Sequence, residues 1–250
     1  MKATHSAVGV YEPLQTLKPV DDNIWVVDGP LIHFKSVPFP TRTTIVRLQG
    51  DDLFVHSPVE LTPDLKRAVD ELGEVKHLVS PNRIHYWWIG QWAEHYPDAK
   101  KWASPGARAA AQKCGWGFDA DLDSAQATPW HAEMEQLLVT GSRVLEEVVF
   151  FHRSSRTLIL ADLIENFEPQ KVHSKPLKFL MKLAGILDPD GKLPIDLRLS
   201  YRGRHLALNS AIETMLAWQP ERLVVSHGRW YRSNATEELK RAFRWVKVGE

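Results

Sequence analysis

The fold of this chain is decided around residues 75–85, which read Val-Lys-His-Leu-Val-Ser-Pro-Asn-Arg-Ile-His. Residues 77–79 have the apolar, β-branched character of a short buried strand. A Ser-Pro-Asn turn ends that strand, and Asn82 is a residue type that caps helices. We therefore predict that the strand leads into a helix over residues 83–96. His85 then lies just after the end of a strand, where loops gather to form sites.

The predicted helix has one apolar face and a defined end. Its aromatic and apolar residues recur three or four positions apart, which places them on one side of a helix. Pro97 follows and ends it. The residues on this face are His85, Trp88, Ile89, Trp92 and Tyr96.

Upstream of this stretch the sequence predicts strands and one well-marked helix. Residues 23–27 read as a strand because β-branched and aromatic residues dominate them. Residues 43–48 and 53–56 are separated by a Gln-Gly-Asp-Asp turn, which predicts a hairpin. Thr62 caps a helix over residues 63–72, whose first position is a proline and which a glycine closes.

Downstream, strands and helices continue to alternate. A stretch rich in Pro, Gly and Arg, residues 188–204, is predicted as a surface excursion. The remaining elements are predicted strands at 102–103, 134–139, 147–152, 157–160 and 222–225, and predicted helices at 107–114, 176–187, 206–218 and 235–246.

This order of elements predicts an α/β (α+β) fold, a four-layer αββα sandwich of two mixed β-sheets with helices outside. The main rival is a doubly wound Rossmann sheet. However, no Gly-x-Gly-x-x-Gly or Walker-type loop follows a strand, so nothing in the sequence supports nucleotide binding. No linker divides the chain, and we expect residues 1–250 to form a single domain.

Composition narrows the class of protein. The chain has 31 basic and 31 acidic residues, and this neutral balance argues against a nucleic-acid binder. The single cysteine, Cys114, excludes an internal disulfide framework, fits a reducing compartment and is predicted to be a small buried residue. The sequence shows no signal peptide and no apolar run long enough for a transmembrane segment, so we expect a cytoplasmic protein.

Four residues that bind metals elsewhere follow predicted strands: His56, His85, Asp162 and His227. Taken alone, a histidine or aspartate after a strand is more often hydrogen-bonded to the backbone. Imidazoles together with a carboxylate are the ligands that zinc or iron prefers in a hydrolytic site. Their common placement predicts a metal site at the ends of the strands.

The same stretches resemble the metallo-β-lactamase superfamily from about Val20 to the C-terminus. Residues 43–59, the helix after them and residues 75–82 look like its first half. Residues 157–162 are similar to the strand that delivers its bridging aspartate, and residues 223–228 resemble the strand and loop that carry its last histidine.

A closer resemblance is to an uncharacterised bacterial branch of that superfamily, which carries a domain-of-unknown-function label and no established reaction. Three motifs carry it: His-Ser-Pro at residues 56–58, Ser-Pro-Asn-x-x-His at residues 80–85, and the strand pair at residues 147–158.

The chain departs from the superfamily pattern in one half of the metal motif. Where the first motif is His-x-His-x-Asp-His, this chain retains only the last position, His85, and has Ser80, Asn82 and Ile84 in place of the first two histidines and the aspartate. His56 replaces the aspartate of an Asp-Thr-Gly turn, and the middle histidine falls at Ser142 or Arg143. The resemblance implies that the three-histidine site is lost, while the ligands of the second metal persist.

The resemblance therefore implies a degenerate site that binds one divalent metal (zinc, iron or manganese) through His85, Asp162 and His227. His56, Asn82 and Glu147 are expected nearby as a further ligand or as hydrogen-bond partners of a ligand. The implied reaction is metal-dependent hydrolysis of an ester, thioester, lactone or amide, a small-molecule substrate. Asp162 is expected to orient the attacking water, and either the metal or Asn82 to stabilise the oxyanion.

The alternative is a non-catalytic module that binds a small ligand and holds no metal. Five of the ten tryptophans lie between residues 87 and 116, and they serve either as core residues or as the lining of a cleft with Trp87, Trp88 and Trp92.

Two basic stretches of the sequence each allow more than one interpretation. The segment from Arg198 to Arg204 is interpreted as a solvated helix start or loop, or as an anion site for a carboxylate or phosphate. Lys175, Lys178 and Lys182 lie opposite leucines, which favours an ordinary amphipathic helix over a helix in peripheral contact with a membrane.

Overall fold

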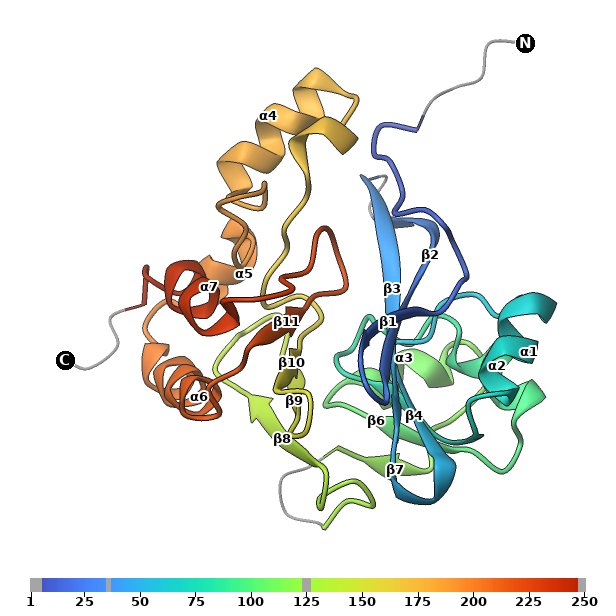
Figure 1. Cartoon of the computed structure of the whole chain (residues 1–250). Helices are drawn as coiled ribbons and strands as arrows, with labels where there is room; N and C mark the ends of the chain where they lie inside the picture. The colour runs from blue at the N-terminus through green and yellow to red at the C-terminus, as the bar shows by residue number, and fades with distance from the viewer. Residues whose placement is uncertain (1–5, 35–36, 123–126, 247–250) are drawn as a thin grey trace, which may run out of the picture.

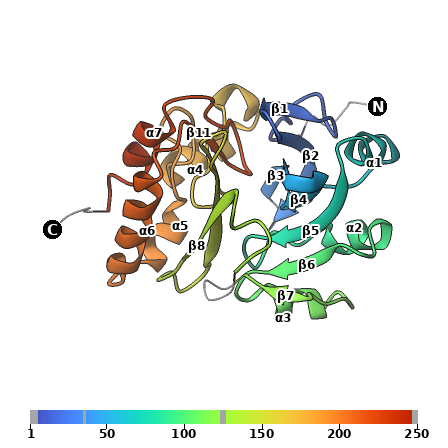
Figure 2. The same cartoon turned by 60° about the horizontal axis from the view of Figure 1, so that its bottom comes forward.

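Two β-sheets lie face to face between outer layers of helices (Figure 1). The computed structural model describes residues 6–34, 37–122 and 127–246. This arrangement confirms the αββα sandwich of mixed sheets predicted from the sequence. Figure 2 shows the layers most clearly: one sheet is covered by α1 (Pro63–Asp70), α2 (Ile89–His95) and α3 (Ala107–Gln112), and the other by α6 (His205–Ala217) and α7 (Ala235–Ala242).

The first sheet changes from antiparallel to parallel pairing at its fourth strand. Within the described residues its strands follow the order of the chain: β1 (Lys18–Asp21), β2 (Ile24–Phe34), β3 (Val37–Arg47), β4 (Asp52–His56), β5 (Glu74–Ser80), β6 (Lys100–Ala103) and β7 (Ala120–Asp121). β1 to β4 pair antiparallel, and β4 to β7 pair parallel. The predicted hairpin is the β3–β4 pair, joined through the short 3-10 helix η1 (Gln49–Asp51).

The second sheet is smaller and also mixed. Its described strands are β8 (Met134–Val139), β9 (Glu147–His152), β10 (Thr157–Ile159) and β11 (Arg222–Val224). β8, β9 and β10 pair antiparallel, while β11 lies parallel to β10. The long excursion between β10 and β11 carries a 3-10 helix, η2 (Pro169–Lys171), then α4 (Lys175–Ala184), α5 (Ile195–Ser200) and α6. In Figure 1, α4 rises beyond the same end of the sheets as the β2–β3 hairpin.

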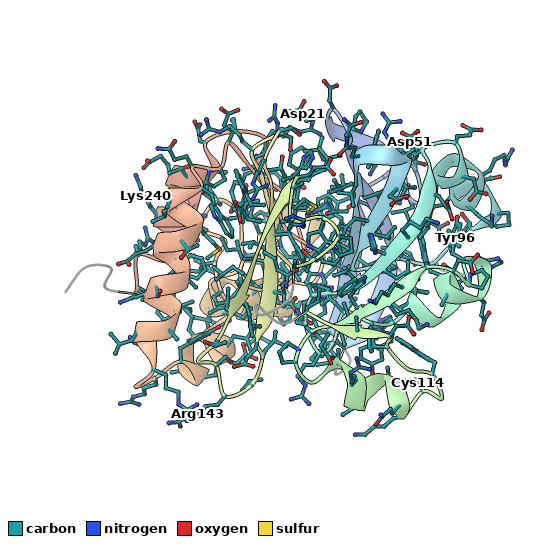
Figure 3. All side chains as sticks on the ribbon, turned by 90° about the horizontal axis from the view of Figure 1, so that it is seen from below. Asp21, Asp51, Tyr96, Cys114, Arg143 and Lys240 are labelled. Atoms are coloured by element: carbon teal, nitrogen blue, oxygen red, sulfur yellow. The ribbon has the colours of Figure 1, made fainter. Side chains whose placement is uncertain are left out.

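Aromatic and aliphatic residues pack together between the sheets. The ring of Trp130 lies 4.8 Å from the ring of Phe54 and 4.8 Å from the ring of Trp102, both edge to face. Phe150 from the opposite sheet packs 5.0 Å from Phe54. Figure 3 shows side chains occupying the gap between the two sheets along its length. Edge-to-face pairs of this kind stabilise a core beyond the area they bury.

Helix α1 shows how local sequence fixes an element. The Thr62 side chain accepts a hydrogen bond from the Leu65 backbone N–H at 3.3 Å, and a proline occupies the first turn. Leu65 and Val69 are fully buried against the first sheet. The cap and the apolar spacing agree, which is why the predicted helix forms here.

The predicted helix over residues 83–96 is wrong in its first half. Residues 83–88 form turns with hydrogen bonds that span three residues, from His85 N–H to Asn82 O and from Ile89 N–H to Tyr86 O. The Asn82 side chain caps only this turn, and the contacts of the His85 ring with Ser57 and Asp162 hold the segment off a helical path. α2 therefore begins only at Ile89.

Two further expectations are corrected. Residues 188–204 were predicted as a surface excursion, but they contain α5, and Leu193 and Tyr201 are buried in the core. Cys114 was predicted to be buried and is exposed, because α3 ends at Gln112 and turns the chain outward. Figure 3 shows Cys114 at the periphery, on the side of α3.

Among the described residues, none of the helices is both long and apolar enough to cross a membrane.

Because His77 is buried, we expect the free energy of unfolding to fall in mild acid. Burial, and then the positive charges of Lys100 and Lys76, lower the pKa of His77 to about 4. Above about pH 6.5 both folded and unfolded chains hold a neutral His77. Below that pH the unfolded chain takes up a proton that the folded chain refuses, so stability falls until about pH 4, by about 3 kcal/mol.

We expect His77→Gln to remove this loss of stability in acid. The glutamine keeps an acceptor for the Trp102 indole N–H, whose nitrogen lies 3.3 Å from His77 Nδ1. Urea unfolding at pH 7 and pH 4.5 measures the change in the free energy of unfolding. His95→Gln on the exposed end of α2 is the control and should follow the wild type. A pH dependence that is the same in His77→Gln and wild type would contradict the assignment.

Candidate metal centre

Three side chains from three loops converge between the sheets. His85 Nε2 lies 3.2 Å from Asp162 Oδ2 and 3.3 Å from Asp162 Oδ1. His227 Nε2 lies 3.2 Å from Asp162 Oδ1. One ligand atom from each residue lies within 4.8 Å of the others, and Asp162 and His227 are buried. The structure thus brings together the three residues that the sequence singled out.

The strand register explains why two of them meet. β10 and β11 are parallel neighbours, with Ile159 opposite Val224 as their last paired residues. Asp162 and His227 each lie three residues beyond these positions, so equal lengths of loop deliver them to the same edge. His85 arrives from the facing sheet, five residues after the end of β5.

Each histidine is oriented through its second ring nitrogen. His227 Nδ1 lies 2.7 Å from the Pro40 carbonyl, and His85 Nδ1 lies 2.6 Å from Ser57 Oγ. Ser57 has a positive φ of 53°, a backbone conformation that L residues rarely adopt and that gathers at functional sites. Ligating histidines typically use the far nitrogen in this way to fix their orientation.

The atoms that face each other fit a cation. A carbonyl only accepts hydrogen bonds, so His227 Nδ1 carries the proton and, in the neutral ring, Nε2 is a bare acceptor. It points at a carboxylate oxygen, which is also an acceptor. Either a second proton or a bound cation resolves this contact. Zn–N and Zn–O bonds of about 2.0–2.1 Å in a tetrahedral site place ligand atoms about 3.3 Å apart. The separations between Asp162 and each histidine, 3.2–3.3 Å, are close to this value.

The carboxylate of Asp162 is held from behind by two residues. Asn82 Nδ2 donates to Asp162 Oδ2 at 2.7 Å. The Glu147 carboxylate accepts the backbone N–H groups of Ala161 at 2.8 Å and Asp162 at 2.7 Å. Asn82 comes from the first sheet and Glu147 from the second, so this network also ties the sheets together.

The electrostatics differ sharply between the two buried carboxyls. Burial opposes ionisation of Asp162, but the neighbouring imidazoles of His85 and His227 outweigh it and hold the pKa of that carboxyl well below its usual range. Burial, together with the charge of Asp162, raises the pKa of Glu147 above its usual range. Asp162 is therefore the anionic group that faces the histidines.

Asn82 does not take the oxyanion role expected from the sequence. It is fully buried, its amide donates to Asp162 and to Glu147 Oε2 at 3.3 Å, and its Oδ1 accepts the backbone N–H groups of Ile84 and His85. With these bonds made, no Asn82 donor is left for a substrate. Asn82 is a positioning residue for Asp162 and for the turn that carries His85.

Glu147 and His56 lie near the site but outside the cluster of three. Glu147 acts as a hydrogen-bond partner of the Asp162 loop, one of the two roles expected for it. His56 is 1% exposed, and its Nε2 has no hydrogen-bond partner among the described residues. Burial and the charge of His85 lower the pKa of His56 to about 3, which keeps its ring neutral. Its ring packs edge to face on Phe150 at 5.7 Å.

A buried arginine that the sequence did not single out fixes the His227 loop. Arg42 is 3% exposed, and its guanidinium donates to the carbonyls of Val225 at 2.6 Å and Gly228 at 2.8 Å. Its charge is balanced by Asp28, 2.9 Å from Nε. Arg42 comes from β3, so it holds a loop of the second sheet from the first. A lone arginine in a strand gives no sequence signal of such a role.

Glu165 was also not identified from the sequence as a residue of the site. It is 6% exposed, its Oε2 has no hydrogen-bond partner among the described residues, and burial raises its pKa to about 8. The sequence signal that could have found it is its position three residues after Asp162, between the buried apolar residues Leu163, Ile164 and Phe167.

The cluster opens into a cavity of about 710 Å³. His85, Asp162, His227 and Glu165 line it, together with many apolar side chains. Of the tryptophans that were expected to line a cleft, Trp87 and Trp88 do so. Trp92 is fully buried under α2 and does not.

The basic segment from Arg198 to Arg204 is divided between buried and exposed residues. Arg198 lies on α5 and donates to the Ala184 carbonyl at 3.1 Å, Tyr201 is buried in the core, and Arg202 and Arg204 are exposed. This arrangement agrees with the solvated helix start or loop that was one of the two interpretations of the sequence.

Comparisons with known proteins agree with this architecture. Residues 21–183 match the family described as Domain of unknown function (DUF4336). The chain belongs to this family. No curated protein sequence matches the chain significantly.

Solved structures place the DUF4336 chain in the metallo-β-lactamase fold. The DIM-1 metallo-β-lactamase exposed to ceftazidime is 13% identical at a TM-score of 0.63, with 96% of this chain and 98% of that chain covered. A metallo-β-lactamase from Pontibacter korlensis is 13% identical at 0.62, covering 92% and 98%. FIM-1 from Pseudomonas aeruginosa, in its mono-zinc form, is 14% identical at 0.58, covering 96% and 97%. At these identities the likeness shows the fold alone.

The network behind Asp162 predicts the effect of a near-isosteric change. In Glu147→Gln, the new side-chain NH2 must face donors that the carboxylate now accepts. We expect a loss of about 1–3 kcal/mol in the free energy of unfolding. Glu146→Gln, at the partly exposed neighbouring position, is the control and should change little. Equal stability of Glu147→Gln and wild type in urea unfolding would contradict the network.

Proposed function

We propose that this DUF4336 protein forms one domain that binds a single divalent metal and hydrolyses an ester, thioester, lactone or amide. One observation carries the proposal: Nε2 of His227 and Nε2 of His85 both face the carboxylate of Asp162 at 3.2 Å, while both Nδ1 atoms are anchored behind. His85, Asp162 and His227 are the residues that would hold the ion. Zinc, iron and manganese suit this ligand set.

When bound, a divalent ion in such a site lowers the pKa of a water and polarises an acyl oxygen. The protein's own residues provide the setting. Asn82 and Glu147 fix the Asp162 carboxylate, which remains ionised and is able to accept a hydrogen bond from a water at the floor of the cavity. Ser57 and Pro40 fix the two rings. Burial of this end of the cavity limits competition from bulk water.

Support for the reaction class comes from the fold and from the cavity. The mono-zinc form of FIM-1 has the same fold, and its name states a single bound zinc. A cavity of this size above three convergent polar residues is what a small-molecule site requires. The cavity alone equally suits a module that binds a ligand without reacting, and that is the second candidate.

Metal content tests the first part of the proposal. Protein purified without a metal-affinity tag and supplied with zinc, manganese or iron should retain about one equivalent per chain by mass spectrometry of the metals. His227→Asn should lose it, because the asparagine amide keeps a donor for Pro40 but offers no Nε2 ligand. His95→Gln should retain it. Less than a tenth of an equivalent of metal per wild-type chain would contradict the proposal.

Stability provides an independent readout. At a zinc concentration 100 times the dissociation constant, the free energy of unfolding should rise by about 2.7 kcal/mol in wild type and not in His227→Asn. Hydrolysis of nitrophenyl esters, acyl thioesters, lactones and amides should then follow metal content. A metal-loaded protein that hydrolyses none of them would favour the binding module.

A further inference from the structure

The cavity above the metal centre has one polar end and one long apolar wall. His85, Asp162, His227 and Glu165 lie at the polar end. The wall is built by two elements that are distant in sequence, the β2–β3 hairpin and α4, with α5 beside them. Figure 1 shows the hairpin and α4 extending beyond the same end of the sheets. A ligand that fills this cavity therefore needs a polar head and an apolar body.

Most side chains of the wall are aliphatic or aromatic, although Asp196 of α5 and Arg83 also line the cavity. Val37 and Phe39 of β3 line one side, Leu177, Leu180 and Met181 of α4 line the other, and Ile195 of α5 closes it. Because none of these side chains offers a hydrogen-bonding group, the wall recognises shape and apolar surface and not a polar pattern.

Three large apolar side chains that line the cavity are exposed to solvent. Leu180 is 60% exposed, Ile195 is 46% exposed and Trp87 is 50% exposed, although all three line the cavity. Large apolar residues gathered at the mouth of a cavity lose water contact when a ligand covers them. A chain-like ligand that runs from the polar end to the mouth covers them together.

Glu165 adds a requirement at the polar end. Glu165 is only 6% exposed and lines the cavity. Its Oε2 has no hydrogen-bond partner among the described residues. A buried carboxyl oxygen without a partner is costly, and an N–H or O–H group of a ligand would satisfy it.

We propose that the cavity binds an acyl compound with an unbranched hydrocarbon chain. The chain lies between α4 and the β2–β3 hairpin, the acyl group reaches His85, Asp162 and His227, and an N–H or O–H group beside the acyl carbon donates to Glu165. Cleavage of that acyl bond rests on the proposed function, whereas binding of the chain does not.

A lipid surface is the competing occupant. α4 carries Lys175, Lys178 and Lys182, and its Phe179 and Leu183 are about as exposed as Leu180. However, Leu180 lines the cavity and Leu183, 59% exposed on the same helix, does not. The continuity of Leu177, Leu180 and Met181 with the polar end favours a ligand inside the cavity. A bilayer would instead engage Leu180 and Leu183 alike.

Calorimetric titration with hexanamide, octanamide and decanamide tests the proposal on the full chain. These uncharged probes carry a carbonyl and an N–H donor, and they avoid repulsion by Asp162. We expect affinity to rise roughly tenfold for each two methylenes added. Leu180→Gln should weaken decanamide binding at least fivefold, and its matched control Leu183→Gln less than twofold. Ile195→Gln and Leu199→Gln form a second pair on α5, because Leu199 is 62% exposed but does not line the cavity.

The outcomes separate this proposal from the metal hypothesis. Chain-length dependence in zinc-free and zinc-loaded protein, with the expected contrast within both pairs, supports the acyl-chain site whether or not hydrolysis is found. Affinity that does not change with chain length overturns it, even if zinc binds. Decanamide binding that is weakened equally by Leu180→Gln and Leu183→Gln also overturns it. If both variants then bind vesicles of anionic phospholipid equally poorly, a membrane surface is the occupant.

Discussion

The rest of this structure depends on a single buried anion, the carboxylate of Asp162. It is 3% exposed at the junction of the two sheets, where ionisation is costly unless nearby groups compensate. The compensation comes from both sheets at once: Asn82 and His85 follow β5 of the first, and His227 follows β11 of the second. Glu147 completes the arrangement by holding the backbone on which Asp162 sits. The site and the contact between the sheets are therefore one network.

This network also gives physical meaning to the departures from the superfamily pattern. Asn82, which stands where the resemblance expects a histidine, now bonds Asp162 and caps the turn that carries His85. His56, which stands where an aspartate is expected, is a neutral, buried ring packed on Phe150. Both replacements thus contribute to the structure around the three clustered residues, Asn82 through its hydrogen bonds and His56 through its packing.

The sequence predicted the layers and the three convergent residues because both follow from local signals. Strand ends are marked by apolar runs, and Asp162 and His227 lie at equal distances beyond two of them. It did not predict contacts that only the packing of the two sheets creates, namely Pro40 on His227, Arg42 on the His227 loop and the isolated Glu165. It failed at residues 83–88 because helical spacing cannot show that the tertiary contacts of His85 override it. It failed at Cys114 because the end of a short helix sets the exposure of the next residues.

The most direct test of a single metal held at Asp162 is anomalous diffraction from a crystal grown with zinc, with data collected above and below the zinc absorption edge. We expect one strong anomalous peak between the sheets, about 2.0–2.2 Å from His85 Nε2, His227 Nε2 and a carboxylate oxygen of Asp162. No peak at this position in zinc-soaked crystals, or a zinc ion bound elsewhere with His227 Nε2 turned away from Asp162, would contradict it.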